Sequence, residues 1–265
     1  MNDDELHALQ RDTFGYFLEK STPEGLVPDS TREGSPASIA AIGFALSAYP
    51  VAVERSFLCR AEAARRVLAT LRFFRDSPQG REPDATGYRG FYYHFLDLAT
   101  GRRAWRSELS TIDSAYVLAG ALTAGRYFDR DTAEERELRE LAEELYRRAD
   151  WGWAQNGGLT VGHGWKPETG FLPYRWEGYS EALILYVLGL GSPTHGIAPE
   201  SYEAWASTYR WKKLYGHEFV YAGPLFIHQL SHIWIDFRGI KDEYMRATGI
   251  DYFENSRRAT YVQQQ

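Results

Sequence analysis

Hydrophobic residues recur every three to four positions along most of this chain, the spacing that places them on one face of an α-helix. Helices are predicted over residues 6–18, 37–53, 60–74, 111–128, 131–149, 179–190, 200–214, 224–235 and from 244 to the end. Shorter stretches at 90–98 and 158–161 resemble strands. The pattern therefore predicts an all-α protein with small β-hairpin insertions.

The predicted helices alternate in character. Residues 37–53 and 111–128 are apolar on nearly all sides, whereas 60–74 and 131–149 have one apolar face. A two-layered helical barrel or toroid needs this alternation because its inner ring is buried on both sides. We therefore expect a single domain of this kind over residues 1–265.

The last helical pattern continues through residues 261–265 without a glycine or proline to end it. This abrupt end predicts that the C-terminal helices of the barrel are missing. Without these helices, apolar surface of the inner ring would be exposed, so self-association is expected.

Composition narrows the classes of partner and compartment. The chain has 265 residues and a net charge of -6, and it shows no basic stripe for a nucleic acid. Its single cysteine, Cys59, excludes an internal disulfide framework. No apolar run reaches the roughly 20 residues that span a membrane. The acidic start does not resemble a signal peptide, so the expected location is cytoplasmic, or periplasmic if the natural N-terminus was trimmed.

Aromatic residues make up 15% of the chain, including 8 Trp and 18 Tyr, and many lie in the predicted turns. The densest segment, 171–181, sets two acids among aromatic rings and an arginine. Its candidate ligand contacts are Arg175, Trp176, Glu177, Tyr179 and Glu181. Flat rings can stack on the C–H face of a sugar while carboxyl groups take its hydroxyls or glycosidic oxygen. We therefore interpret the segment as a saccharide site.

Two acids stand four residues apart in this segment, Glu177 and Glu181, so on a helix they would face each other. The apolar run 182–188 leaves the helix after Glu181 little exposed surface. A buried carboxyl group must be paired, protonated or turned toward a wet cavity. A raised pKa would suit Glu181 to the role of general acid.

Asp113 has two interpretations. The spacing of Ser110 and Asp113 fits a capping box, in which the serine caps the helix and the acid returns to the cap amide. Alternatively, Asp113 is catalytic. Glu108 is a loop acid that could face the same cleft.

Several histidines are also candidates. His228 and His232, with Asp236 four residues further on, have the spacing of zinc-binding helices but lack the glutamate that follows the first histidine in metalloproteases. We therefore expect them to line the cavity or form hydrogen bonds in the core. His163 and Trp165 lie in a glycine-rich loop and are candidate ligand contacts.

Five segments together resemble the bacterial glucoamylase-like family, which includes endo-β-1,2-glucanases and is related to a domain of cyclic β-1,2-glucan synthases. The segments are SELSTIDS (107–114), WGWAQNGG (151–158), YSEALILYVL (179–188), GSPTH (191–195) and GPLFIHQLSHIWIDFRG (223–239). The resemblance implies a double-layered barrel of the (α/α)6 type and a glycoside hydrolase activity. The implied substrate is an oligo- or polysaccharide, a β-1,2-linked glucan, and no metal or other cofactor is implied.

The resemblance also implies that Asp113 and Glu181 are the catalytic carboxylates, in unassigned order. Two positions depart from the glucanase pattern: glucanases have Glu at the position of Asp113 and Asp at the position of Ser110. Family members also continue well beyond residues 251–258.

Two alternatives to the hydrolase stay open at this stage. A non-catalytic or vestigial module would bind glycans through its aromatic residues without turnover. In a purely structural helical toroid, Asp113 would be only a cap.

Overall fold

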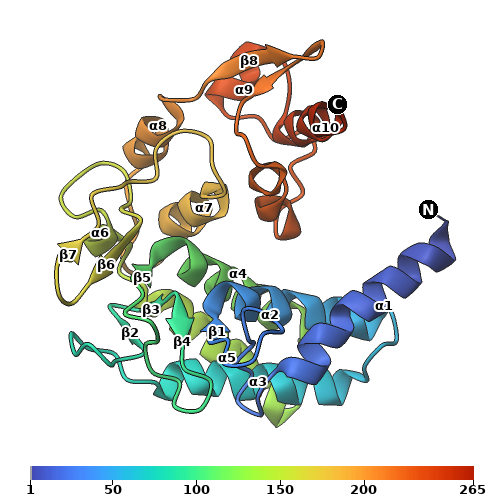
Figure 1. Cartoon of the computed structure of the whole chain (residues 1–265), viewed down its shortest axis with the longest axis vertical. Coiled ribbons are helices and arrows are strands. Elements are labelled where there is room, and N and C mark those ends of the chain that lie inside the picture. Colours follow the sequence, from blue (N-terminus) through green and yellow to red (C-terminus); the bar gives the residue numbers. More distant parts are fainter. Residues whose placement is uncertain (1) are drawn as a thin grey trace.

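The computed structural model describes residues 2–265, and it is mostly helical with small sheets (Figure 1). The helices are α1 (Asp3–Lys20), α2 (Ile39–Glu54), α3 (Arg60–Asp76), α4 (Thr111–Tyr127), α5 (Ala133–Arg148), α6 (Trp151–Ala154), α7 (Leu183–Gly191), α8 (Glu200–Ala206), α9 (Glu243–Thr248) and α10 (Tyr252–Gln263), with 3-10 helices η1 (Leu225–His228) and η2 (Leu230–Ile233). The strands are β1 (Ala37–Ser38), β2 (Gly87–Tyr88), β3 (Phe91–Tyr93), β4 (Phe95–Leu96), β5 (Leu109–Ser110), β6 (Gly164–Lys166), β7 (Gly170–Phe171), β8 (Trp211–Leu214) and β9 (His217–Val220). None of the described helices combines the length and the apolar character that crossing a bilayer requires.

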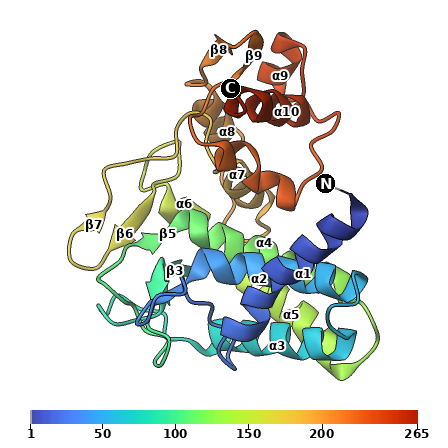
Figure 2. The ribbon, with the colours of Figure 1, turned by 45° about the vertical axis from the view of Figure 1, so that its right-hand side comes forward.

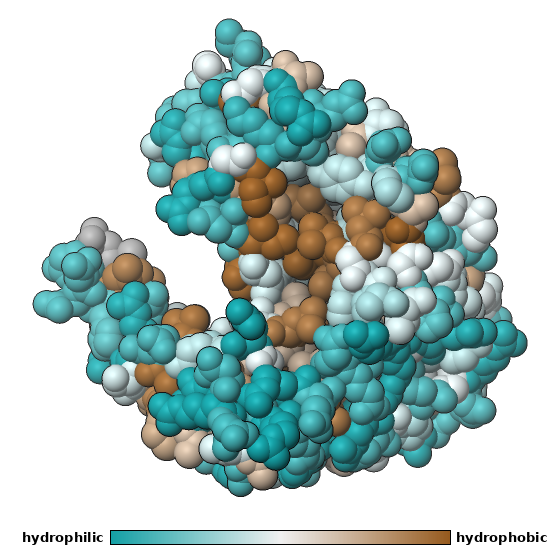
Figure 3. Space-filling view, turned by 180° about the vertical axis from the view of Figure 1, so that it is seen from behind, coloured by the Kyte–Doolittle hydropathy of each residue, from teal (hydrophilic) through white to brown (hydrophobic). Residues whose placement is uncertain are grey.

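The helices follow a curve that leaves the two ends of the chain apart (Figure 1), and the space-filling view shows a hollow on the inner side of that curve (Figure 3). Helices α2 and α4 pack against each other, and α3 and α5 cover them on the side away from the hollow. Helix α4 also contacts α7, which continues along the hollow. The layering agrees with the sequence pattern, because α2 and α4 are largely buried whereas α5 buries one face.

Two glycines allow α2 and α4 to approach closely. A Cβ atom added to Gly43 would lie 2.5 Å from the carbonyl oxygen of Tyr116, and one added to Gly120 would lie 2.3 Å from the carbonyl oxygen of Gly43. The backbones of the two helices are therefore in direct contact, and no side chain fits between them.

We expect Gly43→Ala to destabilise the fold by about 2 kcal/mol, because the added methyl group forces the two backbones apart. The matched control is Gly15→Ala in α1, where the nearest atom to the added Cβ lies 4.0 Å away. That control should gain about 0.5–1 kcal/mol from the better helix former. Urea unfolding of both variants measures the difference, and equal stabilities would contradict this packing.

The largest sheet has five short antiparallel strands in the order β2-β3-β5-β6-β7. Ser110 of β5 pairs with Tyr92 of β3 on one side and with Gly164 of β6 on the other. Strand β5 runs directly into α4, so the sheet holds the N-terminus of that helix (Figure 2).

The helix predicted over 200–214 is wrong in its second half. Helix α8 ends at Ala206, and the following segment forms the hairpin of β8 and β9. Tyr215 and Gly216 have φ values of 48° and 82°, the left-handed conformations of a tight hairpin turn. That turn reverses the chain and pairs the two strands.

Three further predictions need correction. The run 224–235 forms the two 3-10 helices η1 and η2, in which Ser231 is bonded to Ile184 N in the first turn of α7 and to Glu181 O just before it. The helix predicted from 244 is divided by Gly249, whose φ is 78°. Residues 158–161 form turns, and no strand is present there.

The hollow is lined by hydrophobic residues over much of its wall (Figure 3). Among the exposed apolar side chains are Phe226 and Ile233 of the 3-10 helices, at 49% and 50% exposure. Self-association through apolar surface stays a prediction, as does the assignment of the whole chain to one domain.

Candidate active site

Asp113 lies in the first turn of α4, where the sheet meets the helix. Ser110 caps the helix, and its Oγ accepts a hydrogen bond from the Asp113 amide at 3.2 Å. The carboxylate is oriented toward a histidine, with Oδ2 3.6 Å from Nε2 of His94. The serine half of the predicted capping box is therefore formed, while the Asp113 carboxylate contacts a different partner.

His94 connects two acids. Its Nδ1 lies 3.0 Å from Oε1 of Glu108, and its other ring nitrogen faces Asp113. Burial lowers the pKa of His94, but the hydrogen bond that its ring donates to Glu108 and the charge of Asp113 outweigh that effect, so the pKa is raised. The same hydrogen bond lowers the pKa of Glu108. His94 is thus favoured in its protonated form beside Asp113.

The surroundings of Asp113 act on it in opposite directions. Burial raises its pKa, and the charge of His94 partly opposes that shift, leaving the pKa above its ordinary value. Asp113 as a whole residue is 8% exposed. An ionised Asp113 is therefore costly to maintain and depends on His94.

Glu181 lies just before α7, and the prediction that Glu177 and Glu181 share a helix face is wrong. Helix α7 begins only at Leu183, because the preceding segment makes turns whose backbone is bonded elsewhere. Ser231 of η2 donates to the carbonyl oxygen of Glu181 at 3.3 Å and accepts from Ile184 N at 3.1 Å. Two elements, α7 and η2, therefore position Glu181.

The charge of Asp113 acts on Glu181. Burial raises the pKa of Glu181, and the negative charge of Asp113 raises it further. Tyr116, one turn along α4 from Asp113, is affected by both acids: burial raises the pKa of its phenol, and the charges of Glu181 and Asp113 add to the shift. Its buried hydroxyl has no hydrogen-bond partner among the described residues. Asp113, Tyr116 and Glu181 thus form one polar cluster within largely apolar surroundings.

The apolar wall is a stack of rings. The Tyr116 ring lies 5.4 Å from those of Phe44 and Trp234, and the Tyr116 and Trp234 rings are nearly parallel. Trp234 also donates from Nε1 to Ser47 Oγ at 2.9 Å. Such flat faces beside two carboxyl groups suit the apolar side of a sugar ring.

Trp176 and His163 lie beside the start of α4. The indole nitrogen of Trp176 donates to Thr111 Oγ1 at 3.0 Å, and its ring stacks on His163 with centroids 3.9 Å apart. Burial lowers the pKa of His163, so the ring is favoured in its neutral form. Because Thr111 is two residues from Asp113, the structure brings this pair toward the acids.

Arg175 and Glu177 form hydrogen bonds with the neighbouring loop at residues 155–160. Arg175 donates to Thr160 Oγ1 at 2.9 Å, to Gln155 O at 2.6 Å and to Thr160 O. Glu177 is exposed and accepts from Thr160 Oγ1 at 2.9 Å. The structure thus engages both side chains in bracing the loop, and their substrate contacts stay a prediction.

Trp165 and Tyr179 lie in separate aromatic clusters. Trp165 is in β6, with its ring centroid 5.2 Å from that of Tyr88. Tyr179 packs beside Tyr209 and His228 in the part of the molecule formed by the later helices. No recorded contact joins either ring to Asp113 or Glu181 within the described residues.

The histidines considered as metal ligands lie apart from the acids. His228 is 1% exposed and lies within hydrogen-bonding distance of Ala222 O and Asn255. Over residues 2–265, no group of three or more His, Cys, Asp or Glu side chains is arranged to hold a metal ion.

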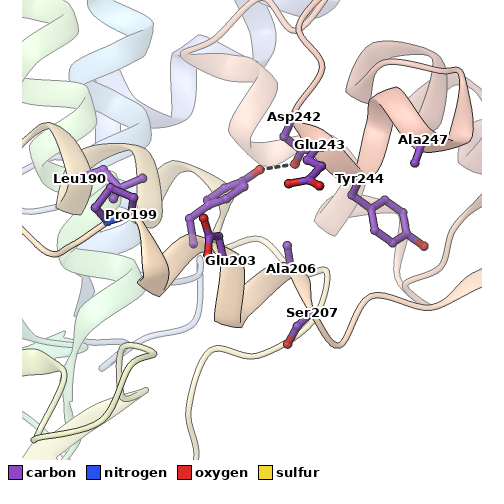
Figure 4. A pocket seen from close by; sticks show the side chains of 10 residues that line it. Leu190, Pro199, Glu203, Ala206, Ser207, Asp242, Glu243, Tyr244 and Ala247 are labelled. Atoms are coloured by element: carbon purple, nitrogen blue, oxygen red, sulfur yellow. Dashed lines mark hydrogen bonds between the residues drawn. The ribbon is translucent and has the colours of Figure 1, made fainter.

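The largest cavity described lies elsewhere. It measures about 510 Å³ between α8 and α9 (Figure 4). Asp242 at its edge accepts from Tyr202 at 2.6 Å and from Tyr252, and it also caps α9 through Met245 N. These bonds fasten α8, α9 and α10 together, so we interpret Asp242 as structural.

Three residues of the site were not identified from the sequence: His94, Tyr116 and Trp234. His94 lies within a strand-like run, Tyr116 lies within the apolar helix predicted over 111–128, and Trp234 lies within the helix predicted over 224–235. Only Tyr116 could have been found from the sequence, because it follows Asp113 by three residues and so lies on the same face of the predicted helix.

Comparison with known proteins shows which families and folds this chain is similar to. Residues 173–265 match the family described as "Putative glucoamylase". Over its full length, the chain is 25% identical to an exo β-1,2-glucooligosaccharide sophorohydrolase (non-reducing end) of Parabacteroides distasonis and covers 40% of that protein.

Solved structures show the same fold. A structure described as a putative glucoamylase of Bacteroides uniformis is 31% identical, with a TM-score of 0.88 over 99% of this chain and 65% of its own. An endo-β-1,2-glucanase of Chitinophaga pinensis, solved with sophorotriose and glucose, has a TM-score of 0.87 over 99% of this chain and 66% of its own. At 24% identity, that likeness concerns the fold alone. The chain thus spans about two thirds of these solved chains and less than half of the curated relative.

Proposed function

Because this chain is related to the glucoamylase-like family, we propose that it is a glycoside hydrolase acting on a β-1,2-linked glucan with Asp113 and Glu181 as its carboxylate pair. The observation that carries the proposal is the placement of these two acids, from α4 and the start of α7, within electrostatic reach of each other beside aromatic rings. The relation to a sophorohydrolase at 25% identity supports the linkage.

The surroundings of the two acids suggest separate roles. Burial raises the pKa of Asp113 as well, but the protonated His94 beside it opposes that rise and favours the ionised state. The pKa of Glu181 is raised by burial and by Asp113. Two acids whose surroundings differ in this way suit an acid and a base. In this proposal, Glu181 protonates the glycosidic oxygen while Asp113 acts as the ionised carboxylate.

The distance between the two carboxyl groups determines what Asp113 does. A gap of roughly 5 Å makes the ionised acid a nucleophile with retention, and roughly 6.5–9.5 Å leaves room for a water and gives inversion. Trp176 and His163 would hold a sugar unit next to the acids, and Trp165, Arg175, Glu177, Tyr179 and Glu108 are proposed to contribute to the wider site. We also propose that α2, α4 and α7 belong to the inner ring of a double-layered (α/α) barrel, with α3 and α5 outside.

The test is incubation of the purified chain with linear β-1,2-glucan, with a β-1,3-glucan and cello-oligosaccharides in parallel, following new reducing ends. We expect release from the β-1,2-glucan alone. Binding of the glucan without release would instead support the non-catalytic binding module. If the chain neither binds nor cleaves any glucan, the saccharide proposal is wrong.

The His94–Asp113 contact predicts a specific pH dependence. Activity should fall at low pH as Asp113 becomes protonated and at high pH as Glu181 loses its proton. Since His94 lowers the pKa of Asp113, His94→Gln should move the acidic limb of the profile upward by about one pH unit. The alkaline limb, which reports Glu181, should stay nearly in place.

Profiles of kcat/KM against pH measure this shift. His195→Gln is the matched control, because His195 is exposed in the segment after α7 and no recorded contact among the described residues joins it to either acid. A His94→Gln profile that coincides with that of the control would contradict the proposed contact.

A further inference from the structure

One strongly exposed aromatic residue has no role in the site so far. Trp105 lies in the turn between β4 and β5, and it is 68% exposed. Its indole is a large flat surface, and a large apolar ring left in water is unfavourable unless something covers it.

The turn that carries Trp105 has an unusual backbone. Trp105 and Arg106 have φ values of 53° and 52°, in the left-handed region that costs free energy for residues other than glycine. Two consecutive residues of this kind persist only where their surroundings hold them in place, and such strain often occurs at ligand sites.

A buried arginine holds this turn. The side chain of Arg103 is 1% exposed, and it donates to Ser107 O at 2.6 Å and to Arg106 O at 2.9 Å. The same guanidinium pairs with Glu168 at 2.8 Å and lies over the ring of Tyr93. The turn is therefore rigid, and it presents Trp105 in a fixed position.

A chain of contacts connects Trp105 with the acids. Its ring lies 5.1 Å from that of Phe95, which in turn stacks on His94 with centroids 4.0 Å apart and planes at 12°. His94 contacts Asp113. Trp105 is thus the exposed end of a row of contacting side chains that leads through Phe95 and His94 to the proposed catalytic carboxylate.

We propose that Trp105 is a distal saccharide-binding platform, on which a sugar ring of the glucan stacks several units away from the bond that is cleaved. The proposal rests on the proposed function, because it places a further part of the same substrate. A rigid exposed indole loses little conformational freedom when it binds, so it can hold a long chain without taking part in the chemistry.

The experiment compares Trp105→Ala with the parent on a long linear β-1,2-glucan and on sophorotriose. Loss of one stacking contact should raise KM for the long glucan about tenfold with kcat unchanged. Sophorotriose offers at most two sugar units on the Trp105 side of the cleaved bond, so its kcat/KM should change less than about twofold. Trp105→Phe keeps an aromatic face and should recover most of the loss.

The matched control is Tyr215→Ala. Tyr215 is 69% exposed and also has a positive φ, but it lies in the distant β8–β9 turn. If Trp105→Ala behaves like this control on both substrates, or lowers kcat/KM for both substrates by the same factor, the platform is disproved. Those results require an active parent, so they leave the proposed function standing. If the parent protein neither cleaves nor binds any glucan, both proposals are wrong.

Discussion

Replacing Glu181 with glutamine should reduce hydrolysis of β-1,2-glucan by roughly a thousandfold or more, because the amide cannot donate the proton that the leaving oxygen needs. The fold should remain intact, since the shape is preserved and the backbone bonds of Glu181 to Ser231 do not involve its carboxyl group. Initial rates of reducing-end release, together with thermal unfolding, measure both effects.

The matched control for this variant is Glu203→Gln. Glu203 is exposed on α8 and lines the cavity between α8 and α9, away from Asp113. It should retain the rate of the parent. A Glu181→Gln variant that also keeps that rate would remove Glu181 from the mechanism.

Replacing Asp113 with asparagine should abolish activity to a similar extent and at the same time stabilise the protein. The pKa of Asp113 is raised by burial, so the folded state binds this proton more tightly than the unfolded state does. Stability contributed by this group is therefore lost as pH rises from the ordinary carboxyl pKa through the raised one. At pH 7 the neutral amide should gain on the order of 1 kcal/mol.

The sign of this change separates catalysis from capping. If Asp113 acted only as a cap, its loss would destabilise the helix by about 1 kcal/mol. Urea unfolding at pH 7 and at pH 3 measures the difference, and the gain should nearly vanish at pH 3, where both states of the parent carry the proton. A loss of stability at pH 7 would favour the purely structural interpretation.

The long amphipathic and apolar helices were predictable because local spacing alone specifies them. Helices α1 to α5 lie within a few residues of their predicted ranges. The errors occur where tertiary contacts outweigh an apolar run. The Tyr215–Gly216 turn converts the end of a predicted helix into a hairpin, and the bonds of Ser231 to the α7 segment accompany two 3-10 turns in place of a continuous helix.

The candidate site was predictable only in part, for a related reason. Asp113 and Glu181 were noticeable because each is an acid at the start of an apolar run. His94 was not, because its significance arises from contacts with Glu108 and Asp113, which a β-strand pairing brings close. The role of Trp234 likewise depends on Tyr116 and Ser47, which are distant in sequence.

The five-stranded sheet also has a consequence for how the protein acquires its active geometry. Its central strand β5 pairs with residues near 92 and near 164, on both sides in the sequence. Closing such long loops costs chain entropy before any contact compensates for it, so non-local pairings form slowly. Helix α4 can form early from local bonds, but the orientation of its first turn depends on β5. The orientation of Asp113 is therefore set by strand pairings that we expect to form late in folding.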